Sequence, residues 1–345
     1  MKDTKQIRKI LYVSKSNIAL VVMEEIEQSR NILFASQVKI DPANLQVKVL
    51  ELLTNAANFL GFNIKDVEMI FDDPNIVKYS FSDEEFIDCN NEEDIAKEIF
   101  KMAKIDNYFV NEINFSNIVY DDIDKVARVN CQVCASDYIT YKQYLKAIQA
   151  CNVTVTNSTN LYKLLKTNKD EIELVLKFDN EQVVACEYYG CKLNNVKNIT
   201  LNLNEVKQHL SDRFGINYNK VDDVLSIANE LAQTNDMDVT VVNNYDLKTK
   251  TFNNVKAGDI LALYRDEIRT QINNYVDYRN FHNVQVVSNL AINGIDGFGF
   301  STNNEIGLEG LSADKLVGLT NLDVNKQEIT QFSFENKIKS INLAA

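Results

Sequence analysis

The sequence lacks tryptophan altogether and contains only two prolines among its 345 residues. Scarce proline argues against long structureless linkers between domains. Long apolar runs are missing as well, since none reaches the ~20 residues that a membrane-spanning helix requires. The first ten residues, MKDTKQIRKI, are polar and lack the apolar stretch and small-residue cleavage site of a secretory signal. Together these absences predict a soluble cytoplasmic protein.

Acidic residues outnumber basic residues by 49 to 36, and the net charge is −13. A duplex nucleic-acid binder needs a basic stripe to contact phosphates, so this class of protein is disfavoured. Local basic spots on an acidic body can still bind an acidic peptide. The six cysteines fall mostly inside expected strands, which is typical of a reduced cytosol rather than of a disulfide-bonded domain.

What the sequence does contain is one strand pattern written twice. In the stretch 172–203, the apolar runs Ile172–Leu176 and Val183–Tyr189 are separated by a polar turn and followed by a third run. The chain opens in the same way, with Ile10–Val13, Ile18–Met23 and Ile32–Ile40. Short β-branched and aliphatic runs between polar breaks predict buried strands. We therefore expect a duplicated α/β fold.

Helix-like sequence follows the first strand pattern. Apolar residues recur at helical spacing from Leu45 to Leu60, and Gly61 is a natural helix end. The run Val67–Phe71 predicts a strand that Asp72, Asp73 and Pro74 terminate. The resulting β-β-β-α-β order is typical of an RNase H-like half.

A smaller unit is expected between the two copies. Asn90–Asp94 has the composition of a capped helix start, and Ile95–Met102 shows apolar residues on one face. Phe109–Val119 and Val126–Cys134 predict strands, and Tyr138–Cys151 predicts a second helix. This β-α-β-β-α order indicates a subdomain with its own core.

The second copy continues with alternating helices and strands. The expected helices are 205–213, 221–231 and 260–276, and the expected strands are 239–243, 250–255 and 284–287.

Several of these segments resemble the FtsA family of the bacterial actin-like superfamily. NLNEVKQHLSDRFGINYNKVDDVLSIA resembles its strand, helix and AE-x-x-K stretch, and LYRDEIRTQI resembles its R-x-E-E-I helix. VQVVSNLAINGIDGFGF resembles the LTGGG strand and turn, and ADKLVGLTNL the end of the folded core. The resemblance covers nearly the whole chain and rests on order and pattern more than on invariant motifs.

The resemblance implies a two-lobed actin-like fold with an FtsA-type inserted subdomain. Its boundaries in this sequence are the first lobe core at 1–76 and 148–170, the inserted subdomain at 77–147, the second lobe core at 171–215 and 284–322, the second lobe's outer subdomain at 216–283, and a tail at 323–345.

The family binds ATP between two hairpin turns, and both turns depart from its pattern here. The first turn needs Asp and Gly but contains Ser14, Lys15 and Ser16 instead. The second turn keeps only Asp179 and places Glu181 where a phosphate would be repelled. A weak site for ATP with Mg²⁺ would use Ser14, Lys15, Ser16 and Asp179. The alternative is that these are ordinary polar turns at a lost site.

Two further nucleotide-binding elements of the family are also altered. The adenosine loop has a single late glycine, Gly294, and Ser226 stands at the position of the ribose-side Lys. We expect no catalytic residues, no metal ligands and no resident cofactor. Cys131 and Cys134 have the spacing of a redox or metal pair, but residues three apart in a strand point to opposite faces.

Two functions follow from the resemblance. The first is an FtsA-like scaffold without ATPase activity, which links FtsZ to the membrane at the division site and associates with itself. The second is an active actin-like ATPase or a filament- or pilus-assembly protein. In the family, the FtsZ tail docks on the second lobe's outer subdomain, and the matching helix here carries Arg265 and Arg269 on one face. Ordinary surface arginines are the alternative.

The C-terminal tail is the expected membrane contact, since family members end in an amphipathic helix. If the tail is helical, Phe334, Ile338 and Ile341 share one face, and Lys337 flanks it near lipid phosphates. The stripe is short, so a disordered or core-packed C-terminus is the alternative. A membrane-bound protein of this kind would be peripheral, at the inner face of the cell membrane.

Overall fold

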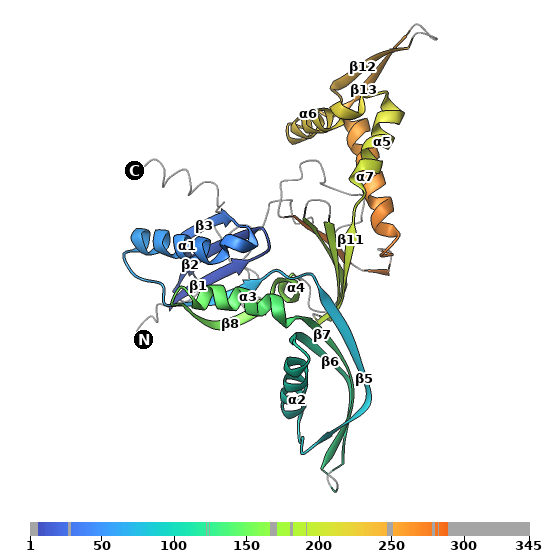
Figure 1. The fold of residues 1–345 in the computed structure, drawn as a ribbon. Coiled ribbons are helices and arrows are strands. Elements are labelled where there is room, and N and C mark those ends of the chain that lie inside the picture. The colour runs from blue at the N-terminus through green and yellow to red at the C-terminus, as the bar shows by residue number, and fades with distance from the viewer. Residues whose placement is uncertain are drawn as a thin grey trace. The chain divides into compact units, whose positions relative to one another are not determined.

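The computed structural model describes residues 6–288, apart from 27–28, 122, 124, 166–170, 180–181, 191, 247–250, 278–279 and 282. The chain forms two compact units (Figure 1). Among the described residues the first unit comprises 6–165 and 188–196, and the second comprises 171–187 and 197–288. No helix in this part of the chain is long and apolar enough to span a membrane.

The first unit is built on a mixed five-stranded sheet with the order β3-β2-β1-β4-β8. β1 is antiparallel to β2, and β2 to β3, whereas β1, β4 and β8 run parallel to one another. The bounds are β1 Gln6–Val13, β2 Asn17–Ile26, β3 Ser29–Lys39, β4 Asp66–Phe71 and β8 Thr154–Asn160.

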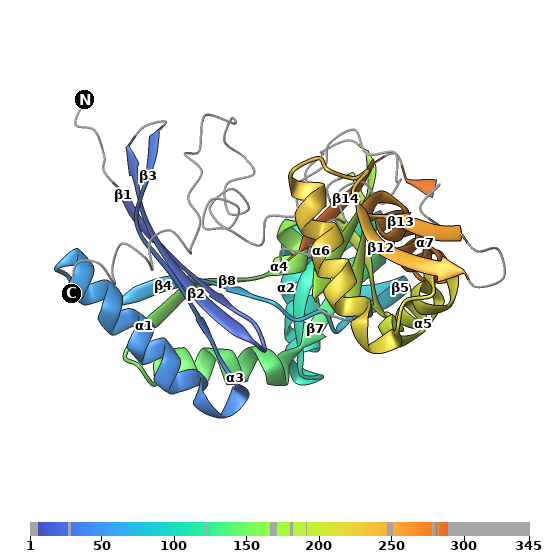
Figure 2. The same ribbon diagram turned by 90° about the horizontal axis from the view of Figure 1, so that it is seen from above.

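Two helices pack on one face of this sheet. The first, α1 (Leu45–Leu60), follows a 3-10 turn (Pro42–Asn44), has the expected bounds and ends at Gly61 with a φ of 77°. The second, α3 (Tyr138–Gln149), lies on the same side (Figure 2). The other face is buried too, as Ile10 and Val21 show. Burial on both faces explains why these strands read as continuous apolar runs.

The inserted subdomain has the expected strand-helix-strand-strand order. A three-stranded antiparallel sheet of order β5-β7-β6 carries α2 on one face. Ile95 and Ile99 of α2 pack there against Val129 and Val133 of β7. The bounds are β5 Ile76–Ile87, α2 Glu92–Ile105, β6 Tyr108–Asp121 and β7 Val126–Asp137.

The placement of α3 differs from the sequence expectation. We expected the helix 138–151 to belong to the core of the inserted subdomain, but Tyr144 and Ile148 pack in the core of the first sheet. The physical reason is connectivity, because α3 leads directly into β8, which pairs with β4. A helix that connects to a parallel strand packs back onto the sheet containing that strand.

A second sheet, which belongs to the second unit apart from 188–196 of β10 and β11, repeats the strand order of the first. This sheet has the order β11-β10-β9-β14, and β9 pairs in parallel with β14 just as β1 pairs with β4. This repeated order confirms the expected duplicated α/β fold of the actin-like class. The bounds are β9 Ile172–Asp179, β10 Gln182–Tyr189, β11 Lys192–Thr200 and β14 Asn283–Ser288.

Helices and a hairpin complete the second unit and agree with the expected elements. Val206 and Leu210 of α5, and Ile268 and Ile272 of α7, pack with Leu174 and other residues of β9 in one core. The bounds are α4 Leu161–Leu164 in the first unit and α5 Leu203–Phe214, a 3-10 turn Tyr218–Lys220, α6 Val221–Gln233, β12 Thr240–Asp246, β13 Thr251–Lys256 and α7 Ala257–Asn273 in the second.

Candidate functional site

The carboxyl ends of three parallel strands meet at one edge of the first sheet. Ser14 follows β1, Asp72 follows β4, and Asn160 ends β8. Ligands of open α/β sheets bind at the carboxyl ends of the parallel strands, so this edge is the candidate site of the first unit.

The turn after β1 is closed by hydrogen bonds of its own. The backbone N–H of Ser14 donates to the carbonyl of Asn17 at 2.8 Å. The hydroxyl oxygen of Ser14 accepts from the backbone N–H of Asn17 at 2.9 Å and from that of Ser16 at 3.3 Å. Ser14 itself is buried, whereas Lys15 and Ser16 are exposed. Two backbone N–H groups that could otherwise bind an anion are therefore bonded to the Ser14 hydroxyl.

Two carboxylates lie directly after β4. Asp72 accepts a hydrogen bond of 2.7 Å from the phenol of Tyr12, and its backbone N–H donates to the carbonyl of Val13 at 2.8 Å. Asp73 is fully buried, and its Oδ1 accepts from the backbone N–H and the side-chain amide of Asn75, both at 3.1 Å. Its Oδ2 has no hydrogen-bond partner among the described protein atoms.

Burial controls the charge of Asp73. Loss of hydration raises the pKa of this carboxyl above its usual value, although the hydrogen bonds from Asn75 and the nearby positive charge of Lys15 lower it in part. The negative charge of Asp137 acts in the same direction as burial. Burial thus favours the neutral form of the Asp73 carboxyl group.

A chain of buried polar side chains extends from Asp73 into the inserted subdomain. The amide nitrogen of Asn160 donates to the carbonyl of Asp73 at 3.0 Å and to the hydroxyl of Ser136 at 2.7 Å. The amide nitrogen of Asn111 donates to the same hydroxyl at 2.7 Å, and the Oδ1 of Asn111 has no partner among the described atoms. The two atoms without a partner among the described residues, Oδ2 of Asp73 and Oδ1 of Asn111, are acceptors. A molecule bound here would therefore have to donate hydrogen bonds.

Sequence reasoning did not find Asn111, Ser136 and Asn160. They come from β6, β7 and β8, and only the tertiary structure brings them together. The segment TVTNSTN that forms β8 is polar, so no apolar pattern indicates which of its side chains face the site. The one available signal was that Asn160 caps α4, with its side chain accepting from the N–H of Tyr162 at 3.1 Å.

The other expected nucleotide-binding residues lie in the second unit. Asp179 is the last residue of β9, whereas Glu181 and Gly294 lie outside the described residues. Ser226 is exposed on α6. The pairing of Asp179 with Ser14, Lys15 and Ser16 in one site stays a prediction.

The expected partner-binding arginines lie on α7. Arg265 and Arg269 are both half-buried, and Arg269 forms an ion pair of 2.5 Å with Asp266. Their role in docking stays a prediction. The expected membrane-contact residues, Phe334, Lys337, Ile338 and Ile341, lie outside the described residues.

The cysteine pair of the inserted subdomain is divided between two faces of the sheet. Cys131 packs in the core beneath α2, whereas the sulfur of Cys134 approaches the carbonyl of Leu193 at 3.5 Å on the other side. Burial raises the pKa of each thiol to about 11, so the reactive thiolate is scarce at neutral pH. Among the residues that the structure describes, no group of three His, Cys, Asp or Glu side chains could hold a metal ion.

No family model matches the chain, and no curated protein matches it. Among solved structures, a PilM–PilN type IV pilus biogenesis complex is similar at 11% identity and a TM-score of 0.49, over 90% of this chain and 89% of that chain. The ethanolamine utilization protein EutJ of Carboxydothermus hydrogenoformans is similar at 9% identity and 0.44, over 90% and 88%. A Bacteroides thetaiotaomicron protein with an actin-like ATPase fold is similar at 11% identity and 0.30, over 62% and 79%. The actin-like fold class of this chain rests on the repeated strand order of its two sheets.

Proposed function

We propose that the protein is an actin-like scaffold that binds protein partners in a larger assembly and does not hydrolyse ATP. The observation that supports this is the closed turn after β1, in which the Ser14 hydroxyl accepts from the N–H groups of Ser16 and Asn17.

The closed turn opposes nucleotide binding for two reasons. Phosphate binding by a turn needs backbone N–H groups that point at the ligand, and glycines that let the phosphate approach them. Here the N–H groups of Ser16 and Asn17 are bonded to the Ser14 hydroxyl, and the turn contains no glycine. In addition, Asp72 lies directly beside the turn, and a carboxylate there would repel a phosphate.

The test of this part is calorimetry of the full chain with Mg-ATP, alongside a thermal-unfolding assay. A ligand at a hundred times its dissociation constant stabilises the fold by about 2.7 kcal/mol, which is a measurable shift. We expect neither heat of binding nor a shift in the unfolding temperature. Micromolar affinity for Mg-ATP together with turnover would overturn the proposal in favour of an active actin-like ATPase.

The finer proposal concerns the partner. The FtsA resemblance of 263–272, which form most of α7, supports FtsZ as the partner and a scaffold that links FtsZ to the membrane. The competing partner is a component of a pilus-assembly complex. A pull-down with purified FtsZ, and separately with a pilus-assembly partner, decides between them.

A charge reversal locates the FtsZ contact. If α7 receives the acidic FtsZ tail, Arg265→Glu weakens binding because it replaces attraction with repulsion. Arg213→Glu is the matched control, since Arg213 is an exposed arginine on α5 of the same unit. Equal loss of binding in both variants, or no loss in either, would remove α7 as the docking helix.

A further inference from the structure

The inserted subdomain has one edge that its helix leaves uncovered. α2 packs against β6, at one edge of the three-stranded sheet, whereas β5 forms the other edge (Figure 1). Within the described part of the chain β5 pairs on one side only, with β7. An edge strand offers a row of backbone donors and acceptors to a further strand.

Apolar side chains alternate along the first half of β5. Val77 and Tyr79 pair with Ala135 and Val133 of β7, and Val133 belongs to the core beneath α2, so these side chains lie on the α2 side of the sheet. Val77 is nevertheless 39% exposed and Tyr79 is 37% exposed. Alternate apolar residues on an exposed edge are what a partner strand needs for specificity.

The end of α2 adds to this apolar surface. Tyr79 lies in edge-to-face contact with Tyr108, which begins β6 just after α2, with ring centroids 5.2 Å apart. Ile105, the last residue of α2, is 79% exposed, and Met102 one turn earlier is 40% exposed. The edge of β5 and the end of α2 therefore both present apolar side chains to solvent.

A bulge limits the usable edge and marks where its character changes. The register with β7 shifts between Phe81 and Glu84, and Asp83 has a φ of 52°. Bulges bend a strand and end regular pairing. The pairing edge is therefore 76–81, and it is followed by the exposed acidic residues Asp83, Glu84 and Glu85.

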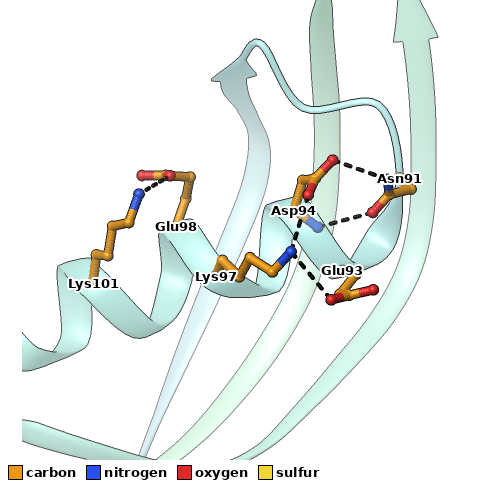
Figure 3. A network of polar contacts seen from close by, with 6 residues as sticks. All are labelled: Asn91, Glu93, Asp94, Lys97, Glu98 and Lys101. Atoms are coloured by element: carbon orange, nitrogen blue, oxygen red, sulfur yellow. Dashed lines mark hydrogen bonds and ion pairs between the residues drawn. The ribbon is translucent and has the colours of Figure 1, made fainter.

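The sequence beyond the bulge is acidic, with seven acidic residues and no basic residue between Lys78 and Lys97. Arg128 of β7 forms an ion pair of 3.0 Å with Glu85, so this acid is partly neutralised. On α2 the acids are partly neutralised, because Lys97 contacts Glu93 at 3.1 Å and Asp94 at 3.3 Å (Figure 3). A partner that lies along β5 would meet the remaining negative charge, so it should carry basic residues at that end.

We propose that the β5 edge docks an extended segment of another protein, in which apolar residues alternate and basic residues follow. The apolar residues would cover Val77 and Tyr79, and the basic residues would meet Asp83 and Glu84. A second copy of this chain fits poorly as a parallel strand, because that pairing would bring two acidic ends together. This surface adds a docking site to the proposed scaffold, and it needs neither nucleotide nor α7.

The experiment uses the full chain and a labelled synthetic peptide that alternates valine with threonine and ends in arginines. A matched peptide ends in glutamates. We expect the arginine peptide to bind at least about tenfold more tightly in fluorescence anisotropy, with the difference reduced by salt. Equal binding of the two peptides, or no binding of the arginine peptide, would overturn the proposal.

Two variants place the binding at β5. Val77→Lys puts a charge on the edge and should abolish binding of the arginine peptide, whereas Val119→Lys makes the same change at an exposed valine on the opposite edge strand β6 and should leave it unchanged. Glu84→Lys should weaken binding by about tenfold through charge alone. Equal effects of the two valine substitutions would overturn the assignment to β5.

Amide hydrogen exchange gives a direct readout that does not depend on substitutions. Binding of the arginine peptide should slow exchange in 76–81 and leave 118–121 of β6 unchanged. Slowed exchange at β6 instead, or sedimentation showing that the full chain dimerises through this edge, would overturn the proposal. The peptide experiments contain no nucleotide. The β5 proposal can therefore fail while the proposed absence of ATP binding holds, and ATP binding can be found while the β5 proposal holds.

Discussion

The two sheets share a strand order but differ in where they bury polar groups. In the first unit, the buried acids Asp72 and Asp73 lie at the carboxyl end of β4, outside the strand itself. In the second unit, Glu173 and Lys177 lie within β9 and are 0% and 1% exposed. The backbone pattern is therefore repeated while the side chains on one face have diverged.

The alternation of β9 explains how a strand tolerates this divergence. Leu174, Leu176 and Phe178 point into the core that α5 and α7 cover, whereas Glu173 and Lys177 belong to the other face. Both charged residues make polar interactions, as buried charges must if the fold is to persist. The face of β9 that packs against the helices therefore carries the apolar core residues, and the opposite face can carry charged residues.

The strongest test of the comparison asks whether the two units have independent cores. Leu52 on α1 and Leu210 on α5 are both fully buried, each in the core of its own unit. Replacing either by alanine should lower the free energy of unfolding by about 2–5 kcal/mol, because a cavity is left. We expect calorimetry to show a different transition shifted by each variant. A single transition lowered equally by both would show one cooperative core.

The next effect concerns the buried acid of the first unit. Asp73→Asn removes a carboxyl whose pKa is raised by burial and whose Oδ2 has no partner among the described atoms. We expect the free energy of unfolding at neutral pH to rise by about 1–3 kcal/mol, because the neutral amide avoids the cost of burying an ionised carboxyl group that lacks a partner on one oxygen.

The pH dependence of this gain has a definite sign. Because the folded pKa of Asp73 lies above its unfolded value, the wild-type protein loses stability as pH rises from the unfolded pKa through the folded pKa. The advantage of Asp73→Asn should therefore vanish in acid and be complete above the folded pKa. Urea titrations of both proteins at several pH values measure it, and an advantage that grows toward low pH would contradict the prediction.

A smaller effect is expected at Asp72, the acid at the same edge whose carboxyl group accepts a hydrogen bond. Tyr12→Phe removes the 2.7 Å hydrogen bond to Asp72 while keeping the buried ring. We expect a loss of about 1 kcal/mol in the free energy of unfolding, measured in urea. A loss of stability in Tyr12→Phe together with a gain in Asp73→Asn would show that Asp72 stabilises the fold and that the buried Asp73 carboxyl group destabilises it. A gain in stability from Tyr12→Phe would contradict this division.

The smallest effect is at the surface of the second unit. His209 on α5 lies 3.0 Å from Glu267 on α7, and this carboxylate raises the pKa of the imidazole above its usual value. The pair stabilises the fold below the unfolded pKa of histidine and stops doing so as pH rises through the folded pKa. Titration by NMR should show the pKa falling in Glu267→Gln. An unchanged pKa would mean that the pair does not form in solution.

Local pattern was enough to predict most of the elements. The helix at 45–60, the helices and strands of the second copy and the repeated strand pattern follow from apolar periodicity, which is a property of neighbouring residues. The end of α1 at Gly61 follows from the freedom of glycine at positive φ. From the repeat and the FtsA-like segments together, the sequence also predicted the actin-like class of the fold.

The sequence by itself determined most of the segments that form strands and helices, because burial on one face or both leaves a periodic trace in the chain. Only the tertiary structure decided that α3 packs on the first sheet and that Asn111, Ser136 and Asn160 meet beside Asp73. These outcomes depend on contacts between residues 24 or 25 positions apart for the hydroxyl of Ser136, and 87 for Asp73 with Asn160. No periodicity within a segment encodes such distances, since they are set by how the strands are ordered in space.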